Sequence, residues 1–599
     1  MILLAHAIDA AWQDAVLDEH VHYRPDLARK GSRALARALG AHRPSILILR
    51  AALDVDAALA WRAAMPEVPL LVICDLTEAD DATALAALGI DARALAPQVA
   101  DEDFAMASLR FAERTWTELV TCARSARATA PRAGRVALVG AGIVNLMTAL
   151  SLAREGHEVI VFEAAPDPRG DAHQSLFGCT CGGDNARMFT LTEADNYNDK
   201  RYEPSGDINV LLDRPVSACG WRIVDGRPLL PAEHLWVDEY RDIPPWLAHA
   251  YTEDILSFNS EAGELWSALR LEEPQLFEDV ALRDGILRLY NDADHFRAQV
   301  ERQRRVGALQ RVLDPDALVE RHPALRAAVE GAALAGAIEV VGFTVAVHDF
   351  VARVLGMLER RGVTLRFDER VHELRWREDQ VTGVVTAAGV TRADSYVISA
   401  GAYGDDLLEG TASHGQVQGV LGVWLTVPNL EPRLRHSLKV SRRGHTAEDS
   451  NITVCDDRDG RPVLILGSGY GWVGLDPENI DAHELEGLFA AVEDTAARLF
   501  PRAHATAVAD GTLMASRRVC VRPWTSSSLG IFETLPARAG GIAIVTGAHN
   551  TGGFAQAPAV AAAVARALRG EHHPMHHLYH PSRRRRFLGH RSARSGLVI

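Results

Sequence analysis

Residues 135–163 read RVALVGAGIVNLMTALSLAREGHEVIVFE, and this stretch decides the fold of the central part of the chain. An apolar run at residues 136–139 predicts a buried strand, which ends in Gly140-Ala141-Gly142. The pattern then predicts an amphipathic helix, followed by a second apolar strand that ends at Glu163. Strand, glycine turn, helix, strand and acid in this order are typical of a dinucleotide-binding unit.

Each part of this motif has a chemical reason. Gly140 allows the tight turn from strand to helix, and Gly142 lets backbone amides approach a pyrophosphate. The helix that begins near Ile143 would direct the positive end of its dipole at the phosphates. The carboxylate of Glu163 can accept hydrogen bonds from both ribose hydroxyls. Asn145 stands where such motifs usually carry a third glycine, so we expect looser packing of helix and strand there.

The composition of the whole chain limits the classes of protein to consider. Its 599 residues exceed one ordinary domain, and 48% hydrophobic with 24% charged residues is typical of a globular protein. A net charge of −16 argues against nucleic acid as a partner. The first residues lack the features of a signal peptide, and no apolar run approaches the ~20 residues that span a bilayer. With seven scattered cysteines, we expect a cytoplasmic protein without a metal site.

Residues 1–126 precede the motif and are predicted to form a domain of their own. Apolar segments at 45–49, 70–74 and 92–96 alternate with helical patterns, which indicates a small parallel α/β domain. This part has no glycine-rich loop and no visible acid–base cluster, so we assign it no catalytic role. Residues 127–134 (RATAPRAG) are small and basic, as expected of a linker.

Three further blocks follow the dinucleotide motif. Residues 361–404 contain RGVTLRFDERV and ADSYVISAGAYG, residues 522–525 read RPWT, and residues 546–558 read TGAHNTGGFAQAP. In this order the four blocks resemble the flavin-dependent D-amino-acid oxidase superfamily, which includes D-amino-acid dehydrogenase, glycine oxidase and sarcosine oxidase. The resemblance covers residues 135–587 and implies FAD as the cofactor.

The resemblance also implies cofactor contacts for particular residues. These are Val371 at the adenine, Ala400 and Gly401 beside the pyrophosphate, and Gly547, Asn550, Thr551, Gly552 and Gly553 at the flavin. Apart from the resemblance, a glycine-rich turn at a helix N-terminus directs backbone N–H groups at an anion such as a reduced flavin. The same glycines are equally consistent with a helix cap after a buried strand.

Four positions are candidates near the reacting atoms. Arg522 matches the family's arginine that pairs with a substrate carboxylate, although it could instead stabilise the flavin loop. Arg187 in GGDNAR resembles an arginine near the flavin of sarcosine oxidase, with a one-residue insertion. Gly182 and Gly183 would let the backbone pass close to the isoalloxazine. Cys520 matches the cysteine that binds flavin covalently in sarcosine oxidase, or it is a small buried hydrophobic residue.

The expected fold class is α/β and α+β, with a Rossmann-like FAD-binding domain and an interleaved mixed-sheet substrate domain after the small N-terminal domain. We predict the FAD-binding domain at 135–199, 338–408 and 513–599, and the substrate domain at 200–337 and 409–512.

The resemblance implies an FAD-dependent oxidoreductase that oxidises a C–N bond of an amino acid or secondary amine. Hydride would pass to flavin N5 and leave an imine. Two alternatives stay open, namely a flavoenzyme that tailors a specialised biosynthetic metabolite and a non-catalytic FAD-binding scaffold. Homo-oligomer formation is also left open.

Overall fold

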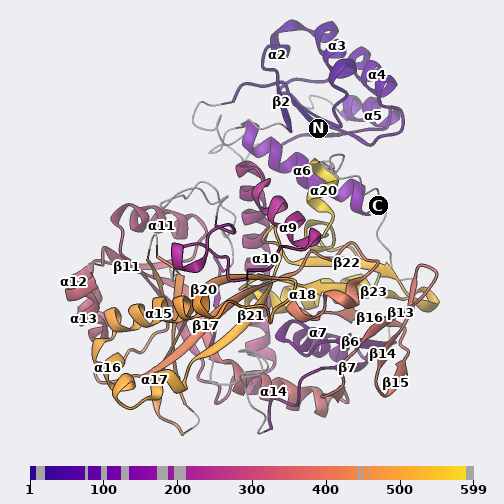
Figure 1. Ribbon diagram of the computed structural model, residues 1–599. Helices are drawn as coiled ribbons and strands as arrows, with labels where there is room; N and C mark the ends of the chain where they lie inside the picture. The colour runs from indigo at the N-terminus through magenta and orange to yellow at the C-terminus, as the bar shows by residue number, and fades with distance from the viewer. Residues whose placement is uncertain are drawn as a thin grey trace.

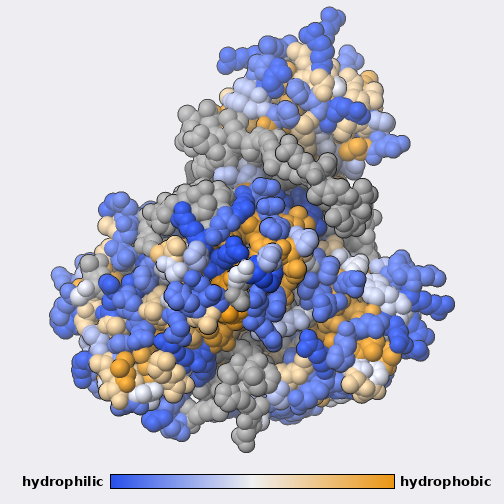
Figure 2. All heavy atoms as spheres, in the orientation of Figure 1, coloured by the Kyte–Doolittle hydropathy of each residue, from blue (hydrophilic) through white to orange (hydrophobic). Residues whose placement is uncertain are grey.

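The computed structural model describes residues 1–8, 20–74, 79–95, 104–122, 134–170, 186–193, 211–224, 226–332, 334–442, 445–446, 449–457 and 459–588. In this part the strands form sheets of five, nine, six and three strands. The five-stranded sheet and its helices lie at one end of the molecule, and the other sheets form a larger body beneath them (Figure 1). On the body, apolar side chains gather near the middle of the viewed face, with hydrophilic side chains around them (Figure 2).

The N-terminal sheet is entirely parallel, with the strand order β2-β1-β3-β4-β5. Its strands are β1 (Ile2–Leu4), β2 (Val21–Tyr23), β3 (Ile46–Ile48), β4 (Leu70–Ile73) and β5 (Ile90–Arg93). Alternate strand residues face opposite sides, so Leu3 and Leu47 pack on the side of α3 (Ser32–His42) and α4 (Val55–Ala64). Ile2 and Ile46 pack on the side of α6 (Phe104–Cys122). The predicted parallel α/β layer is confirmed.

The six-stranded sheet contains the predicted dinucleotide motif as β6 (Arg135–Val139), α7 (Ile143–Arg154) and β7 (Glu158–Phe162). The sheet order is β12-β7-β6-β16-β23-β22, in which only the edge strand β22 (Ile531–Pro536) is antiparallel. The remaining strands are β12 (Thr364–Arg366), β16 (Ser395–Ile398) and β23 (Ile542–Gly547). One face packs on α7, α14 (Val347–Arg360) and α18 (Gly553–Leu568). The other packs on the small sheet of β13 (Glu373–Arg377), β14 (Gln380–Thr386) and β15 (Gly389–Thr391).

The nine-stranded sheet forms the second half of the body. Its path is β10-β11-β9-β18-β19-β20-β17-β21, and β8 pairs with β11. The bounds are β8 (Ala186–Thr190), β9 (Arg283–Tyr290), β10 (Leu309–Leu313), β11 (Gly336–Ala346), β17 (Gln418–Pro428), β18 (Leu438–Ser441), β19 (Asp449–Asp456), β20 (Pro462–Gly474) and β21 (Arg518–Trp524). Leu421, Val423 and Leu425 point to the face that α15 (Ala482–Leu499) and α16 (Pro501–Ala509) cover. The alternate residues of β17 therefore lie on the opposite face.

Strand pairing does not follow the predicted domain boundaries. β8, β11 and β21 all pair in the nine-stranded sheet, although the sequence assigned their residues wholly or mainly to the FAD-binding segments. Which sheet each of these strands joins depends on pairing with strands that lie far along the chain. The division into domains itself stays a prediction.

Long helices cover the side of the body next to the N-terminal domain. They include α9 (Pro231–Arg241) and α10 (Pro245–Glu272), and α10 packs against both α18 and α6. Among the described residues, no helix is long and apolar enough to cross a membrane.

Candidate functional site

The glycine turn after β6 has the geometry that its sequence predicts. Gly140 has φ +94°, and a Cβ there would overlap the carbonyl oxygen of Ser399, so only glycine fits. Gly142 is the N-cap of α7, and a Cβ there would meet no atom within 4 Å. The turn is therefore pressed against β16 on one side and open beside the start of α7.

Asn145 joins the helix to the strand at the third position of the motif. Its side chain is fully buried, and Nδ2 donates hydrogen bonds of 2.8 Å to the carbonyl oxygens of both Val139 and Gly140. Side-chain hydrogen bonds thus take the place of the close packing that a third glycine would allow. Within the described residues, Oδ1 of Asn145 is buried without a hydrogen-bond partner, which is uncommon for a buried acceptor.

Glu163 lies at the end of β7, where its carboxylate closes the turn. Oε2 accepts a 2.6 Å hydrogen bond from the amide of Ala141, and Oε1 accepts one of 2.9 Å from Ala165. An ionised carboxylate has about four acceptor positions, so two backbone donors leave capacity for ribose hydroxyls. The amide of Glu369 donates to the Glu163 carbonyl at 2.9 Å, which brings the segment of buried Val371 to this edge.

The other predicted glycine positions meet at the ends of β16 and β23. Ala400, Gly401 and Gly547 line one hollow of about 20 Å³. Gly547 has φ +127°, and a Cβ there would lie 2.9 Å from Oγ of Ser399. The turn at residues 547–553, which we call the signature turn, continues through Asn550, whose φ is 54°, into α18 at Gly553. Four segments that are far apart in sequence thus converge on one edge of the sheet.

The signature turn is bonded to the end of the Arg522 strand. The amide of Asn550 donates to the carbonyl of Pro523 at 3.2 Å, and Oδ1 of Asn550 accepts from the amide of Thr525 at 3.4 Å. Nδ2 of Asn550 donates to the carbonyl of Ser528 at 2.6 Å. The structure therefore brings two separately predicted motifs into direct contact.

The guanidinium of Arg522 is held from one side. It passes over Gly422, where a Cβ would overlap it, and Nη1 donates to the Gly469 carbonyl at 3.0 Å. Cζ of Arg522 lies 5.8 Å from the ring centroid of Tyr470, which in turn stacks on Trp221 at 4.9 Å. Cation–π contact and a backbone hydrogen bond orient the guanidinium while other N–H donors stay available for a carboxylate.

Cys520 lies two residues before Arg522 on the same face of β21. Its side chain is only 4% exposed, and the indole Nε1 of Trp424 donates to Sγ at 3.2 Å. An indole donor and a buried environment are compatible with both interpretations of this thiol, so a covalent flavin bond stays a prediction.

Arg187 pairs through its backbone with Val345 where β8 lies beside β11. Its side chain lies outside the described residues, and so do Gly182 and Gly183.

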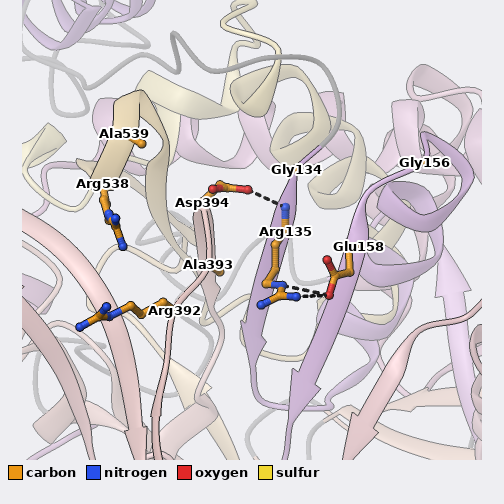
Figure 3. Close-up of a pocket in the computed structure, with 9 residues that line it drawn as sticks. All are labelled: Gly134, Arg135, Gly156, Glu158, Arg392, Ala393, Asp394, Arg538 and Ala539. Carbon is orange, nitrogen blue, oxygen red and sulfur yellow. Dashed lines mark hydrogen bonds and ion pairs between the residues drawn. The ribbon is translucent and has the colours of Figure 1, made fainter.

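A separate hollow lies at the opposite edge of the six-stranded sheet. It has a volume of about 630 Å³ and is lined near the start of β6 and β7 by Arg135, Glu158 and Asp394, with Arg392 and Arg538 opposite (Figure 3). Arg135 pairs with Glu158 at 2.7 Å, and its amide donates to Asp394 at 2.8 Å. The glycine turns lie at the other ends of these strands, so this hollow is not part of the converging site.

Comparison with known proteins identifies the chemistry of this arrangement. The family model described as FAD dependent oxidoreductase matches residues 135–567. The chain belongs to this FAD-dependent oxidoreductase family. The match begins at the first residue of β6, so the N-terminal sheet lies outside it. Resemblance to this family, FAD as the cofactor and an enzymatic role as an oxidoreductase are therefore confirmed.

Two bacterial relatives are each named D-amino acid dehydrogenase. That of Methylobacterium sp. (strain 4-46) is 28% identical over 316 residues, which cover 49% of this chain and 67% of the relative. That of Xanthobacter autotrophicus is 25% identical over 397 residues, covering 63% and 86% respectively. The crystal structure of fructosamine oxidase (Amadoriase II) from Aspergillus fumigatus covers 77% of this chain and 92% of its own, with a TM-score of 0.51 and 15% identity. This likeness confirms the fold class.

The residues at the converging edge fit FAD. An open helix N-terminus at Gly142, spare acceptor capacity on Glu163 and the unsatisfied Oδ1 of Asn145 are polar features that a dinucleotide can satisfy. Gly401 has φ +66°, and a Cβ there would meet no atom within 4 Å, so the backbone beside this hollow is open to close approach by a ligand. Which of these residues hold FAD remains a prediction from the sequence.

Sequence reasoning missed a partly buried ion pair beside the signature turn. Nζ of Lys439 on β18 lies 2.5 Å from Oε2 of Glu193, whose Oε1 is 3.5 Å from the hydroxyl of Thr551. The carboxylate and ammonium are 246 residues apart in the chain. A lysine inside the short apolar strand β18 was the available signal, because a charge in such a run requires a partner.

His549 lies within the signature but takes no charged role. Its ring is buried, and Nδ1 is 3.1 Å from Oε1 of Gln556. Burial lowers the pKa of His549 to about 4, against a smaller opposing effect of Gln556, so the ring is neutral near pH 7.

Proposed function

We propose that this protein oxidises the C–N bond of an amino acid whose carboxylate is bound by Arg522. The observation that carries the proposal is the oriented guanidinium at the end of a strand that is hydrogen-bonded to the flavin signature. A guanidinium can bind a carboxylate through two parallel hydrogen bonds, which fixes the direction of the adjoining Cα–H bond. The names of the bacterial relatives, D-amino acid dehydrogenase, support an amino acid as substrate.

The residues of this chain would divide the work of binding and orientation. Gly140, Gly142 and Glu163 would hold the pyrophosphate and ribose, and α18 would present its amide dipoles to the flavin. Bound FAD supplies the acceptor for the hydride, and the amino acid leaves as an imine. Arg522 holds the carboxylate, and the Tyr470–Trp221 stack prevents the guanidinium from turning away.

An anaerobic substrate screen on the FAD-loaded protein tests this proposal. D-Alanine, D-proline or sarcosine is added and the loss of flavin absorbance is followed. We expect bleaching with at least one amino acid and none with its decarboxylated amine. Arg522→Met keeps a long apolar stem, and we expect it to retain FAD but to lose ~100-fold or more in kcat/KM, because charge-assisted hydrogen bonds are lost.

Two results would contradict the proposal. One is equal bleaching by an amino acid and by its decarboxylated amine, since the carboxylate would then be irrelevant. The other is no bleaching by any amino acid or amine, which would favour the scaffold alternative. A cytoplasmic location stays part of the proposal, because an odd number of scattered cysteines suits a reducing compartment.

A further inference from the structure

Helix α6 connects the N-terminal domain to the FAD-dependent body. It packs on β3 and β4 of the N-terminal sheet and also on α10, α19 (Met575–Leu578) and α20 (Arg583–Leu588). Figure 1 shows α6 between the N-terminal sheet and the body, with the C-terminal helix α20 beside it. The helix is therefore contacted from both sides, and its buried polar residues, such as Glu113, must find partners within the protein.

Arg583 supplies the buried partner for α6. Its Nε and Nη2 bind the two carboxylate oxygens of Glu113 at 2.8 and 2.5 Å, and Nη1 binds Oδ2 of Asp254 on α10 at 2.7 Å. Arg114 of α6 also pairs with Asp254. The side chains of Arg583, Glu113 and Asp254 are at most 2% exposed. Burial lowers the pKa of Arg583, but both carboxylates outweigh it and raise that pKa above its usual value.

The same C-terminal segment also reaches a third carboxylate, that of Glu239 on α9. Nε of Arg585 binds Oε1 of Glu239 on α9 at 2.6 Å, and the hydroxyl of Ser526 donates to Oε2 of Glu239 at 3.2 Å. Glu239 is only 5% exposed. These side chains line a narrow hollow of about 30 Å³ together with Tyr251. Glu239 thus links the C-terminal arginines to the loop that follows Arg522.

That loop is fixed at its other end to the flavin signature. The hydroxyl of Thr525 donates to the Leu529 carbonyl at 2.6 Å, and Asn550 donates to the Ser528 carbonyl at 2.6 Å. Hydrogen bonds therefore join α6 to Arg583, and Arg585 to Glu239 and Ser526, while the backbone of α20 and of the 525–529 loop supplies the remaining links to the end of β21.

We propose that Arg583 and Arg585 are positioning residues that couple α6 of the N-terminal domain to the 525–529 loop and so set the carboxylate affinity of Arg522. This inference rests on the proposed function of Arg522. It gives the N-terminal domain a role in substrate binding, although none of the residues described at the converging site belongs to that domain. The geometry favours coupling over simple stabilisation, because Arg583 and Arg585 of one short helix bind three carboxylates that belong to α6, α10 and α9.

A double-mutant cycle on the full-length, FAD-loaded protein tests the coupling. The variants are Glu113→Gln, Ser526→Ala and their combination, and the control is Glu118→Gln, an exposed glutamate of the same helix. The readout is the Kd of benzoate, measured from the shift of the flavin spectrum in samples matched for FAD content. Loss of stability alone does not change this Kd in folded, FAD-loaded molecules.

We expect each single variant to weaken benzoate binding about 5-fold and the control to leave it unchanged. Because Glu113 and Ser526 share no direct contact, independent effects would multiply to about 25-fold, whereas coupled effects leave the double variant near 5-fold. Multiplying effects, or unchanged binding in every variant, would overturn the inference. If Glu113→Gln does not fold, Arg585→Gln replaces it in the same cycle. A wild-type flavin that responds to no carboxylate would remove the proposed function, and the inference with it.

Discussion

Replacing Gly422 with alanine should displace Arg522 without removing any polar group. Gly422 lies on β17 opposite Cys520 of β21, and the guanidinium of Arg522 crosses the position that a Cβ would occupy. The overlap involves Nη2, Nη1 and Cζ, so the side chain must turn as a whole. Turning would break the 3.0 Å hydrogen bond to the Gly469 carbonyl and the contact with Tyr470.

The expected magnitude follows from the hydrogen bonds that the displaced guanidinium can no longer make. A hydrogen bond to a charged group contributes about 1.5–3 kcal/mol, and a misaligned guanidinium loses one or both bonds to a carboxylate. A loss of about 2–4 kcal/mol corresponds to a ~30- to ~700-fold rise in Kd. FAD binding should change little, because Gly422 lies on the nine-stranded sheet and away from the glycine turns.

Benzoate titration of the flavin spectrum measures this Kd, and anaerobic bleaching by an amino acid measures kcat/KM. The control is Gly383→Ala on β14, where a Cβ would lie 2.9 Å from Val390 and 3.1 Å from the Thr391 carbonyl but far from Arg522. Like Gly422→Ala, this control places a Cβ in a crowded position on a strand. It should therefore lower the stability of the fold without changing the Kd of benzoate. A Gly422→Ala protein that retains FAD and binds benzoate within about 3-fold of wild type would refute the role of Arg522.

Two further predictions concern the cofactor edge and the C-terminal histidines. Asn145→Ala removes the hydrogen bonds to Val139 and Gly140, each of which contributes about 1 kcal/mol. We therefore expect this variant to lose FAD faster than the wild type on dialysis. An unchanged rate of FAD loss would contradict this prediction. Burial lowers the pKa of His576 to about 4 and of His577 to about 3. Below pH ~6.5 the unfolded state therefore binds more protons than the folded state, so stability is complete above pH 6.5 and falls as the pH drops towards 4. Urea unfolding should show that the free energy of unfolding falls by about 2 kcal/mol per histidine between pH 7 and pH 5. The fall should be smaller in His577→Gln than in the wild type. Equal falls in the two proteins would exclude His577 as a cause.

The cofactor edge was largely predictable from local patterns. Gly140, Gly142 and Glu163 lie within one strand–helix–strand unit, and the positions of such residues depend on the periodicity of neighbouring side chains. The sequence places Asn145 at the third position of the motif, but its two carbonyl partners depend on how the helix lies against the strand. The pairing of β21 with β17 could not be read from local patterns in the same way, because the sheet that a strand joins depends on contacts far along the chain.

The side chains that surround Arg522 could not be predicted in the same way. Gly422 precedes it by 100 residues and matters only because β17 and β21 pair in one register. Glu113 and Arg583 are 470 residues apart and become partners only when α20 docks beside α6. No spacing rule connects such residues, because their contact depends on the packing of whole elements.

The amino-acid sequence by itself determined the dinucleotide motif, the separate N-terminal layer and the family to which the FAD-dependent body belongs, because these depend on short patterns read along the chain. Only the tertiary structure decided how Arg522 is oriented, that Glu193 and Lys439 pair, and that α20 contacts both α6 and Glu239 next to the 525–529 loop. Hydrogen bonds and ion pairs act over a few ångströms of space, and in this protein the folded chain brings together groups that lie hundreds of residues apart.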